Sequence, residues 1–250
     1  MDDRETEFQS LSEGQKTFFR RRTVSQSAQS QVDPLPKTLS TVSAKIWGLA
    51  EVKSYTIEMV EEVLDARKVP KHRVISPSLE ITVPAIEAMR YSPLRREIAA
   101  LIASTMDREN ADIAHPSFLS LLQQMTEDEV KILAAFPDVG RVLPVANLWM
   151  SLSDDHAEIL HRNIMPKSIA KLCVNKSRLP LYIDNLVRLK LLHEPEGVKI
   201  GDARIYSNLL RQGFCARILE QPKVRKHSTL EKHTIALSSV GDTFRRACLI

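Results

Sequence analysis

The side chains best suited to bind a metal are the seven histidines, two of which stand close together. His156 and His161 are five residues apart, which on a helix separates their side chains by about 140° and prevents shared coordination. Glu158 and His161 form one Glu-x-x-His pair, but a di-iron helical bundle needs that motif twice, together with further glutamates. We therefore expect no metal site and no cofactor.

The three cysteines, Cys173, Cys215 and Cys248, lie far apart and show no C-x-x-C spacing. Neither a disulfide framework nor a thiolate metal site follows from this pattern, whereas reduced and partly buried thiols fit it. No apolar run approaches the roughly 20 residues that cross a bilayer. The acidic start at Asp2 and Asp3 lacks a signal-peptide core. We expect a cytoplasmic protein without a membrane span.

His115, which precedes Pro116, is the strongest candidate for a catalytic base. Asp107 and Asp112 lie shortly before it and could supply carboxylates for hydrolysis. A histidine at a helix start can instead bond the first-turn amides, and residues 107–112 have the polar character of a loop, so we favour structural roles. The seven glycines form no phosphate-binding loop and no G-x-S-x-G motif. A dispersed triad stays open, but we expect a protein that is not an enzyme.

Positive charge is concentrated in the C-terminal third of the chain. Residues 1–165 hold 19 Lys and Arg against 24 Asp and Glu, whereas residues 166–250 hold 16 against 7. A concentrated positive field attracts polyanions, which makes nucleic acid or an acidic protein the expected partner. A well-solvated surface without a partner would have the same composition.

Two groups of residues in this basic third are candidates for nucleic-acid contacts. On the polar face of a predicted helix, Arg and Asn could bond base edges while Lys meets phosphates, although Asp184 would repel phosphates. A basic loop before a predicted strand could reach the backbone as a wing does. The candidates are Lys171, Lys176, Arg178, Asn185, Arg188, Lys223, Arg225 and Lys226. Use of this surface for a protein partner or as a scaffold is an equally good interpretation.

The elements that position these residues begin after a polar arm. Residues 1–37 contain few large apolar side chains to offset the entropy of ordering, so we expect a mobile arm, with a basic stretch at residues 18–22. From Thr38 to Arg67, apolar residues recur with helical spacing. They are Leu39, Val42, Ile46, Leu49, Val60 and Val63. We expect this helix to pack on its own domain, and the alternative is self-association into a homo-oligomer.

Three helices are expected in the middle of the chain. Their start signals are, in order, Ser92-Pro93, His115-Pro116 and Thr126. The last signal has Glu129 three residues on, which completes a capping box. Before these helices, three prolines between residues 70 and 84 predict an extended stretch, because each removes an amide donor and pushes its predecessor out of the helical region.

The C-terminal region has the element order of a winged helix-turn-helix with inserted pieces. Helices are expected at residues 166–173, 178–192 and 205–219 and from residue 239, with a short strand at 234–237. The second helix has an apolar stripe formed by Leu179, Tyr182, Ile183, Leu186 and Leu189. The expected fold is therefore mainly α. It comprises a helical region over residues 38–125 and a winged-helix-like basic region with a few short strands over residues 126–250.

Five strings of residues in a fixed order carry a family resemblance. They are VISPSL (74–79), LIASTMD (101–107), HPSF (115–118) with TEDE (126–129), YIDNLVRL (182–189) and ALSSVGDTF (236–244). Together they resemble the abortive infection alpha family, bacterial proteins associated with phage defence, over roughly residues 57–250. The chain departs from the family at Lys190, where Gly is usual, and in lacking an N-terminal Gly-rich apolar stretch.

The resemblance implies a setting in phage defence and no established enzymatic activity. Combined with the charge distribution, it predicts a non-enzymatic protein that binds nucleic acid or a macromolecular partner. The alternative is a helical module for protein interaction or oligomerisation that does not bind nucleic acid.

Overall fold

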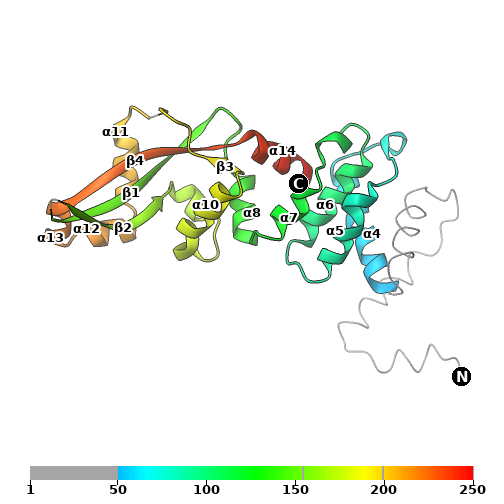
Figure 1. Ribbon diagram of the computed structural model, residues 1–250, viewed down its shortest axis with the longest axis horizontal. Coiled ribbons are helices and arrows are strands. Elements are labelled where there is room, and N and C mark those ends of the chain that lie inside the picture. Colours follow the sequence, from blue (N-terminus) through cyan, green and yellow to red (C-terminus); the bar gives the residue numbers. More distant parts are fainter. Residues whose placement is uncertain (1–49, 154, 199, 250) are drawn as a thin grey trace, which may run out of the picture. The chain divides into compact units, whose positions relative to one another are not determined.

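A computed structural model of the protein describes residues 50–153, 155–198 and 200–249 (Figure 1). The predicted arm over residues 1–37 and the first half of the predicted long helix, with Leu39, Val42, Ile46 and Leu49, lie outside these residues. The second half of that helix is α4, Ala50–Ala66, where Val60 and Val63 are buried in the protein's own core. This part of the helix packs on its own domain, as expected.

Helix α6 is the centre of the first half of the described chain. Every residue from Ile98 to Met106 is buried, and α6 contacts α4, α5, α7 and α14. Its alanines let the neighbouring helices approach closely. The elements of this half are α4, η1 Lys71–Arg73, α5 Leu79–Met89, α6 Arg95–Met106, η2 Ala111–Ile113, α7 Ser117–Leu122 and α8 Glu127–Ala134.

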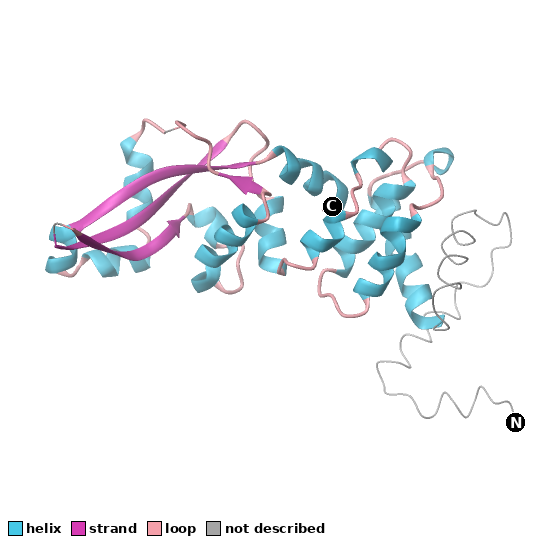
Figure 2. Ribbon diagram, viewed as in Figure 1, coloured by secondary structure: helices cyan, strands magenta, loops and turns pink. Residues whose placement is uncertain are grey.

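The second half contains an antiparallel sheet of four strands in the order β2-β1-β4-β3 (Figure 2). The sheet joins segments distant in the sequence, because β1 pairs with both β2 and β4. The elements are β1 Val142–Ser153, β2 His156–Ile164, α9 Lys167–Ala170, η3 Lys176–Arg178, α10 Leu179–Arg188, β3 Leu192–His193, α11 Ala203–Leu210, α12 Gly213–Leu219, α13 Pro222–His227, β4 Ser228–Leu237 and α14 Ser239–Cys248.

The predicted fold class needs correction, because the second half contains three long strands, β1, β2 and β4. The chain is mixed α/β rather than mainly α with a few short strands. The first part of strand β1 is buried on both faces: Val145 belongs to the core cluster that includes the helices of the first half, while Ala146 and Leu148 belong to a second cluster with Tyr206 and Leu209 of α11. A strand covered on two faces carries a continuous apolar run instead of an alternating one, so its pattern does not separate it from a helix.

The extended stretch predicted around three prolines is largely a helix. Outside the helices lie only Pro70, which is extended, and residues 74–78, and Pro84 lies inside α5. A proline at this position removes one amide donor from the helix. The helix persists because its other face is buried, at Ile81, Ala85, Ile86 and Met89.

Two predictions in the basic third also need correction. The single helix expected over residues 205–219 is divided into α11 and α12, and α12 begins at Gly213. Residues 223–227, expected to form a basic loop, belong to helix α13. Pro222 occupies its first turn, where a missing amide leaves no helical hydrogen bond unmade.

The predicted caps at Thr126 and His115 and the predicted final helix are confirmed, whereas the start predicted at Ser92-Pro93 is wrong by two residues, because α6 begins at Arg95 after Leu94. Thr126 Oγ1 accepts a hydrogen bond from the Glu129 amide, and the Glu129 carboxylate accepts one from the Thr126 amide at 2.6 Å, which completes the capping box of α8. His115 Nδ1 accepts a hydrogen bond from the Ser117 amide at 3.1 Å at the start of α7. Helix α14 begins at Ser239, and the apolar stripe predicted on α10 is buried.

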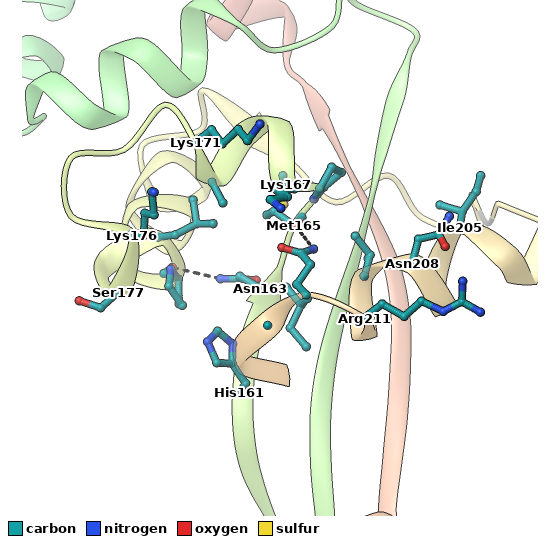
Figure 3. A pocket seen from close by; sticks show the side chains of 18 residues that line it. His161, Asn163, Met165, Lys167, Lys171, Lys176, Ser177, Ile205, Asn208 and Arg211 are labelled. Atoms are coloured by element: carbon teal, nitrogen blue, oxygen red, sulfur yellow. Dashed lines mark hydrogen bonds between the residues drawn. The ribbon is translucent and has the colours of Figure 1, made fainter. Parts of the chain in front are cut away.

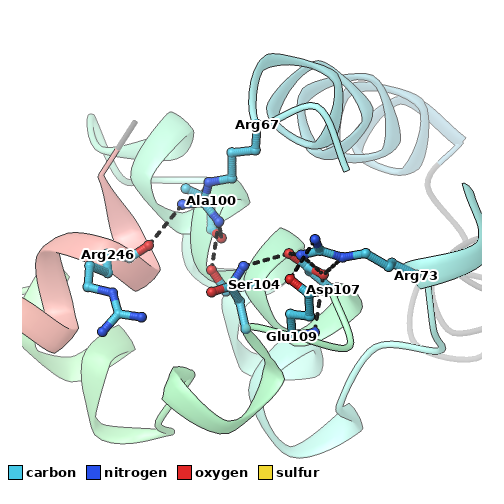
Figure 4. Close-up of polar contacts among 8 residues, drawn as sticks. Arg67, Arg73, Ala100, Ser104, Asp107, Glu109 and Arg246 are labelled. Carbon is cyan, nitrogen blue, oxygen red and sulfur yellow. Dashed lines mark hydrogen bonds and ion pairs between the residues drawn. The ribbon is translucent and has the colours of Figure 1, made fainter. Parts of the chain in front are cut away.

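Arg67, the residue after α4, joins that helix to α6 and to the end of α14 (Figure 4). Its guanidinium donates hydrogen bonds to the carbonyls of Ala247 and Leu249 at the end of α14, and to Ser104 Oγ of α6 at 2.7 Å. Ser104 Oγ in turn donates to the Ala247 carbonyl at 2.7 Å. The last carbonyls of a helix lack partners within it, so Arg67 satisfies two of them from another element.

Candidate nucleic-acid interface

The structure divides the eight candidate residues among three places. Lys171, Lys176 and Arg178 lie between the end of α9 and the start of α10, and we call them the α10-entry group. Asn185 and Arg188 lie near the other end of α10. Lys223, Arg225 and Lys226 lie on α13, and we call them the α13 group. Figure 1 shows α13 at the end of the sheet that lies away from α10, so the two groups are separate basic sites.

The six cations of these two groups are exposed and without partners in the described part of the chain. None of their side chains makes a hydrogen bond or an ion pair with a described residue. An exposed cation of this kind holds only mobile counterions, which a phosphate group can displace. These six side chains are therefore available for the nucleic-acid contacts predicted from the sequence.

Asn185, unlike these six cations, makes hydrogen bonds to other residues of the protein with both its side-chain nitrogen and its side-chain oxygen. Its Nδ2 donates hydrogen bonds to Glu129 Oε1 at 2.6 Å and to the Gln124 carbonyl at 2.9 Å. Its Oδ1 accepts hydrogen bonds from Arg188, whose Nη2 also donates to Gln124 Oε1 at 3.2 Å. In this arrangement Asn185 has no free donor for a base edge, and Arg188 is directed along the protein surface.

The carboxylates of α8 position the start of α10. Asp128 Oδ1 and Oδ2 accept hydrogen bonds from the amides of Val174 at 3.0 Å and Asn175 at 3.2 Å, in the loop between α9 and η3. Burial alone would raise the pKa of Asp128, but hydrogen bonds from these two amides and from Tyr182, together with Lys131, outweigh burial and lower it. Asp128 is therefore an ionised anchor that fixes the loop carrying the α10-entry group.

Asp184, expected to repel phosphates, is partly neutralised. Its Oδ1 accepts a hydrogen bond from Asn163 Nδ2 at 2.8 Å and lies 3.7 Å from Arg162 Nη2. The repulsion of an anion near α10 is reduced accordingly. Asn163 also donates to the Pro180 carbonyl at 3.1 Å, which joins the end of β2 to α10.

A pocket of about 880 Å³ opens beside the α10-entry group (Figure 3). One wall is formed by the end of β2, α9 and the start of α10, and the other by one face of α11 and the start of α12. Gln212 bridges the walls, because its Nε2 donates a hydrogen bond to the Met165 carbonyl at 2.7 Å. Lys171 and Lys176 of the α10-entry group line this pocket.

Two further cations at the pocket, Lys167 and Arg211, were missed by the sequence analysis. Lys167 lies in the first turn of α9, and Arg211 comes from a helix that the sequence does not place near α9. None of the described residues that line the pocket is acidic. Burial lowers the pKa of His161, which also lines it, although a hydrogen bond with the Arg162 carbonyl opposes this effect.

The residues considered for hydrolysis or metal binding either make structural contacts or lie too far from one another to share a metal ion. Asp107 is buried and accepts hydrogen bonds from Arg73 at 2.6 and 2.9 Å (Figure 4). His156 and His161 lie on strand β2 rather than on a helix, so they are separated by about 16 Å along an extended chain. The three cysteines are free and buried. The described residues contain no group of three His, Cys, Asp or Glu side chains that could hold a metal ion, and none of their helices is long and apolar enough to cross a membrane.

Comparison with protein families gives a match over most of the chain. The model of a family described as Abortive infection alpha matches residues 52–248, which include both basic groups, the pocket lining and Arg67. The chain belongs to the abortive infection alpha family. Membership of the abortive infection alpha family implies a role in phage defence.

Other comparisons add little to this assignment. No match is found among the curated proteins. The chain is similar to a solved structure of an uncharacterized protein from the hydrocarbon-degrading marine bacterium Alcanivorax borkumensis SK2, with 17% sequence identity and a TM-score of 0.29. That similarity covers 55% of this chain and 92% of the other.

The strings that carried the abortive infection alpha resemblance have identifiable structural uses. TEDE contains the capping box of α8 and the Asp128 anchor. YIDNLVRL is the buried face and the Asn185 contact of α10. Lys190, where the family usually has Gly, has a φ of 60°, a left-handed conformation that favours glycine, and it follows directly on this string.

Proposed function

We propose that this abortive infection alpha protein acts in phage defence, in the cytoplasm and without enzymatic activity, by binding the backbone of nucleic acid through the α10-entry and α13 groups. The observation that carries the proposal is that six exposed cations in two groups have no partner among the described residues. Contacts made by lysine and arginine to phosphates supply affinity that is independent of base sequence. The contacts of Asn185 within the protein favour such backbone binding over base readout.

The order of elements supports a winged-helix interpretation of this region. Helices α8, α9 and α10 occur in the order of the three helices of a winged helix, with β1 after the first helix and β3 and β4 after the third. The strand order β1-β4-β3 within the sheet agrees with a wing formed by β3 and β4. Helices α11 to α13 would then be an insertion in the wing, which places the α13 group on it.

The proposal is tested by fluorescence anisotropy with a labelled DNA duplex of about 20 base pairs over a range of salt concentrations. We expect binding at low salt, and a logarithmic dependence on salt whose slope gives the number of phosphates contacted. Replacing Lys223→Glu together with Lys226→Glu should reduce the magnitude of the slope by about 2 and weaken binding at least tenfold, because two phosphate contacts are lost.

The matched control is Arg141→Glu, because Arg141 is also exposed but belongs to neither group. Its effect on the slope should be small. Absence of binding at low salt, or an equal loss in the control and the double variant, contradicts the proposal. Parallel measurements with single-stranded RNA determine which nucleic acid is preferred.

A protein partner is the second candidate, supported by exposed apolar side chains beside the α10-entry group. Val174 is 84% exposed and Leu181 on α10 is 61% exposed. Self-association through the long N-terminal helix could not use Val60 and Val63, which are covered by the protein's own core. Light scattering tests whether the protein partner is a second copy of this chain. A dimer that Leu181→Ser converts to a monomer supports association through the surface with Val174 and Leu181. A monomeric mass at all concentrations contradicts self-association.

A further inference from the structure

The pocket beside α10 has the dimensions and stability of a ligand site. Its volume of about 880 Å³ lies within the range of roughly 300–1,000 Å³ found for small-molecule sites. Its two walls are joined by the Gln212 to Met165 hydrogen bond at 2.7 Å, and the Asn163 to Pro180 hydrogen bond at 3.1 Å joins β2 to α10 within one wall. The pocket is open in this structure, so its walls need no rearrangement to admit a ligand.

The chemistry of the pocket is divided between an aliphatic interior and a cationic rim. Aliphatic side chains come from both walls, including Ile164, Met165 and Leu179 on one side and Ile205 and Leu209 on the other. Four cations also belong to the lining: Lys167, Lys171, Lys176 and Arg211 (Figure 3). None of the four side chains has a hydrogen-bond or ion-pair partner among the described residues. A largely apolar cavity with unpaired positive charges and no acidic residue in its described lining matches a molecule with an apolar body and a negative end.

From this complementarity we propose that the pocket binds a small aliphatic acid, a molecule with a saturated hydrocarbon body and a carboxylate or phosphate head. The hydrocarbon lies against the aliphatic walls, where burial removes its methylene groups from water. The head group lies at the rim, where lysine and arginine donate charge-assisted hydrogen bonds.

The lining residues argue against a nucleotide as the occupant. Proteins hold bases by stacking them on Phe, Tyr, Trp or His rings. His161 is the one ring of this kind among the described lining residues, and its Nδ1 lies 2.7 Å from the Arg162 carbonyl. An aliphatic body uses the walls more fully than a base would. The site is additional to the proposed nucleic-acid surface, although Lys171 and Lys176 belong to both.

Isothermal titration with decanoate, below its micelle concentration, tests the proposal on the full-length protein. We expect saturable binding of one decanoate per chain. Decanol and decyltrimethylammonium, which have the same hydrocarbon body, should bind at least tenfold more weakly because they lack the negative head. Equal binding of all three compounds, or uptake of decanoate without saturation, would overturn the proposal.

Two variants locate the binding site. Asn208→Trp places a large side chain at the pocket from an exposed position on α11, so it should weaken decanoate binding at least tenfold without disturbing the fold. Lys167→Glu should weaken decanoate more than decanol, because it reverses a charge at the rim. Circular dichroism confirms that each variant is folded. Unchanged decanoate binding in folded Asn208→Trp shows that the acid binds elsewhere, and the proposal then fails.

Separate measurements distinguish this site from the nucleic-acid surface and from a membrane surface. Lys226→Glu, far from the pocket lining, should weaken duplex binding and leave decanoate binding unchanged. If the chain binds no duplex but binds decanoate as described, the proposed function fails while the ligand site stands. Sedimentation with phosphatidylglycerol vesicles tests the lipid source of the head group: we expect no sedimentation, and vesicle binding without decanoate binding overturns the proposal of a free acid.

Discussion

At the scale of single residues, Gly241 shows how closely the elements of the second half approach one another. It lies in the first turn of α14, and a Cβ atom added to it would stand 2.1 Å from the carbonyl oxygen of Leu191. That oxygen also accepts a hydrogen bond from the Ser238 amide at 3.1 Å. The neighbour is backbone, which cannot rotate away as a side chain can. A glycine at position 241 is thus required by space rather than by backbone conformation.

The Gly241→Ala variant should accordingly lose about 3 kcal/mol or more of its free energy of unfolding, since insertion of a methyl group here forces α14 away from Leu191, the residue before β3. Urea denaturation measures this loss. Gly201→Ala is the control, because a Cβ atom at Gly201 meets nothing within 4 Å. Similar unfolding free energies for the two variants would show that α14 can shift away from β3 at little cost.

At the scale of elements, Asn185 joins α10 to the connection between α7 and α8. Removing its side chain in Asn185→Ala takes away the donor to Glu129 Oε1 and to the Gln124 carbonyl. We expect a loss of about 1–3 kcal/mol in the free energy of unfolding but little change in affinity for a DNA duplex, because the affinity is assigned to lysine and arginine contacts with phosphates. Anisotropy and urea denaturation on the same preparation separate the two effects. Weaker duplex binding with an unchanged free energy of unfolding would show that the Asn185 side chain itself contacts the duplex, which contradicts this prediction.

The elements that could be predicted from the sequence are those with a local signal. The capping box at Thr126, the apolar stripe of α10 and the start of α14 each depend on residues within two turns of one another. Strands β1 and β2 have no such signal. The burial of β1 on two faces depends on α11 and on helices of the first half, and β1 contains Pro144, a residue that argues against a strand.

The residues of the candidate site were likewise predictable only where the sequence carries a local signal. Lys171, Lys176 and the α13 group were found because positive charge is dense in their segments. The pocket was not found, because it forms only where α11 packs opposite the end of β2, and that contact is set by the sheet. The contacts of Asn185 and Arg188 within the protein could not be predicted, since helical periodicity places a residue on an outer face without showing that α8 lies against it.

At the scale of the whole described unit, buried carboxylates link stability to pH. Burial alone would raise the pKa of Asp107, but hydrogen bonds from Arg73, Asn110 and the Glu109 amide outweigh burial and lower it. The pKa of Asp128 is lowered in the same way. A carboxyl group whose pKa is lower in the folded state stabilises the fold above its unfolded pKa of about 3.9, and this stabilisation is lost as the pH falls through the folded value.

We therefore expect the free energy of unfolding to fall steeply below about pH 4. Asp128→Asn should be less stable than the parent protein at pH 7, and the difference should diminish on acidification because the parent then loses the same charge. Urea denaturation at a series of pH values measures both curves. Asp112→Asn, a change at an exposed carboxylate, is the control and should follow the parent curve. A constant difference between Asp128→Asn and the parent at every pH would contradict this assignment.

The pairing of β3 with β4 has a consequence for how the chain acquires its structure. Leu192 and His193 pair with Leu237 and Ala236, so this contact closes a loop that contains all of residues 194–235. Loops of this length lose more chain entropy on closure than helical turns do, and topologies rich in such distant contacts fold in milliseconds to seconds rather than microseconds. The helices around α6 can form early from nearby residues, whereas the sheet, and with it the cavity beside α10, is completed only when the last strand arrives.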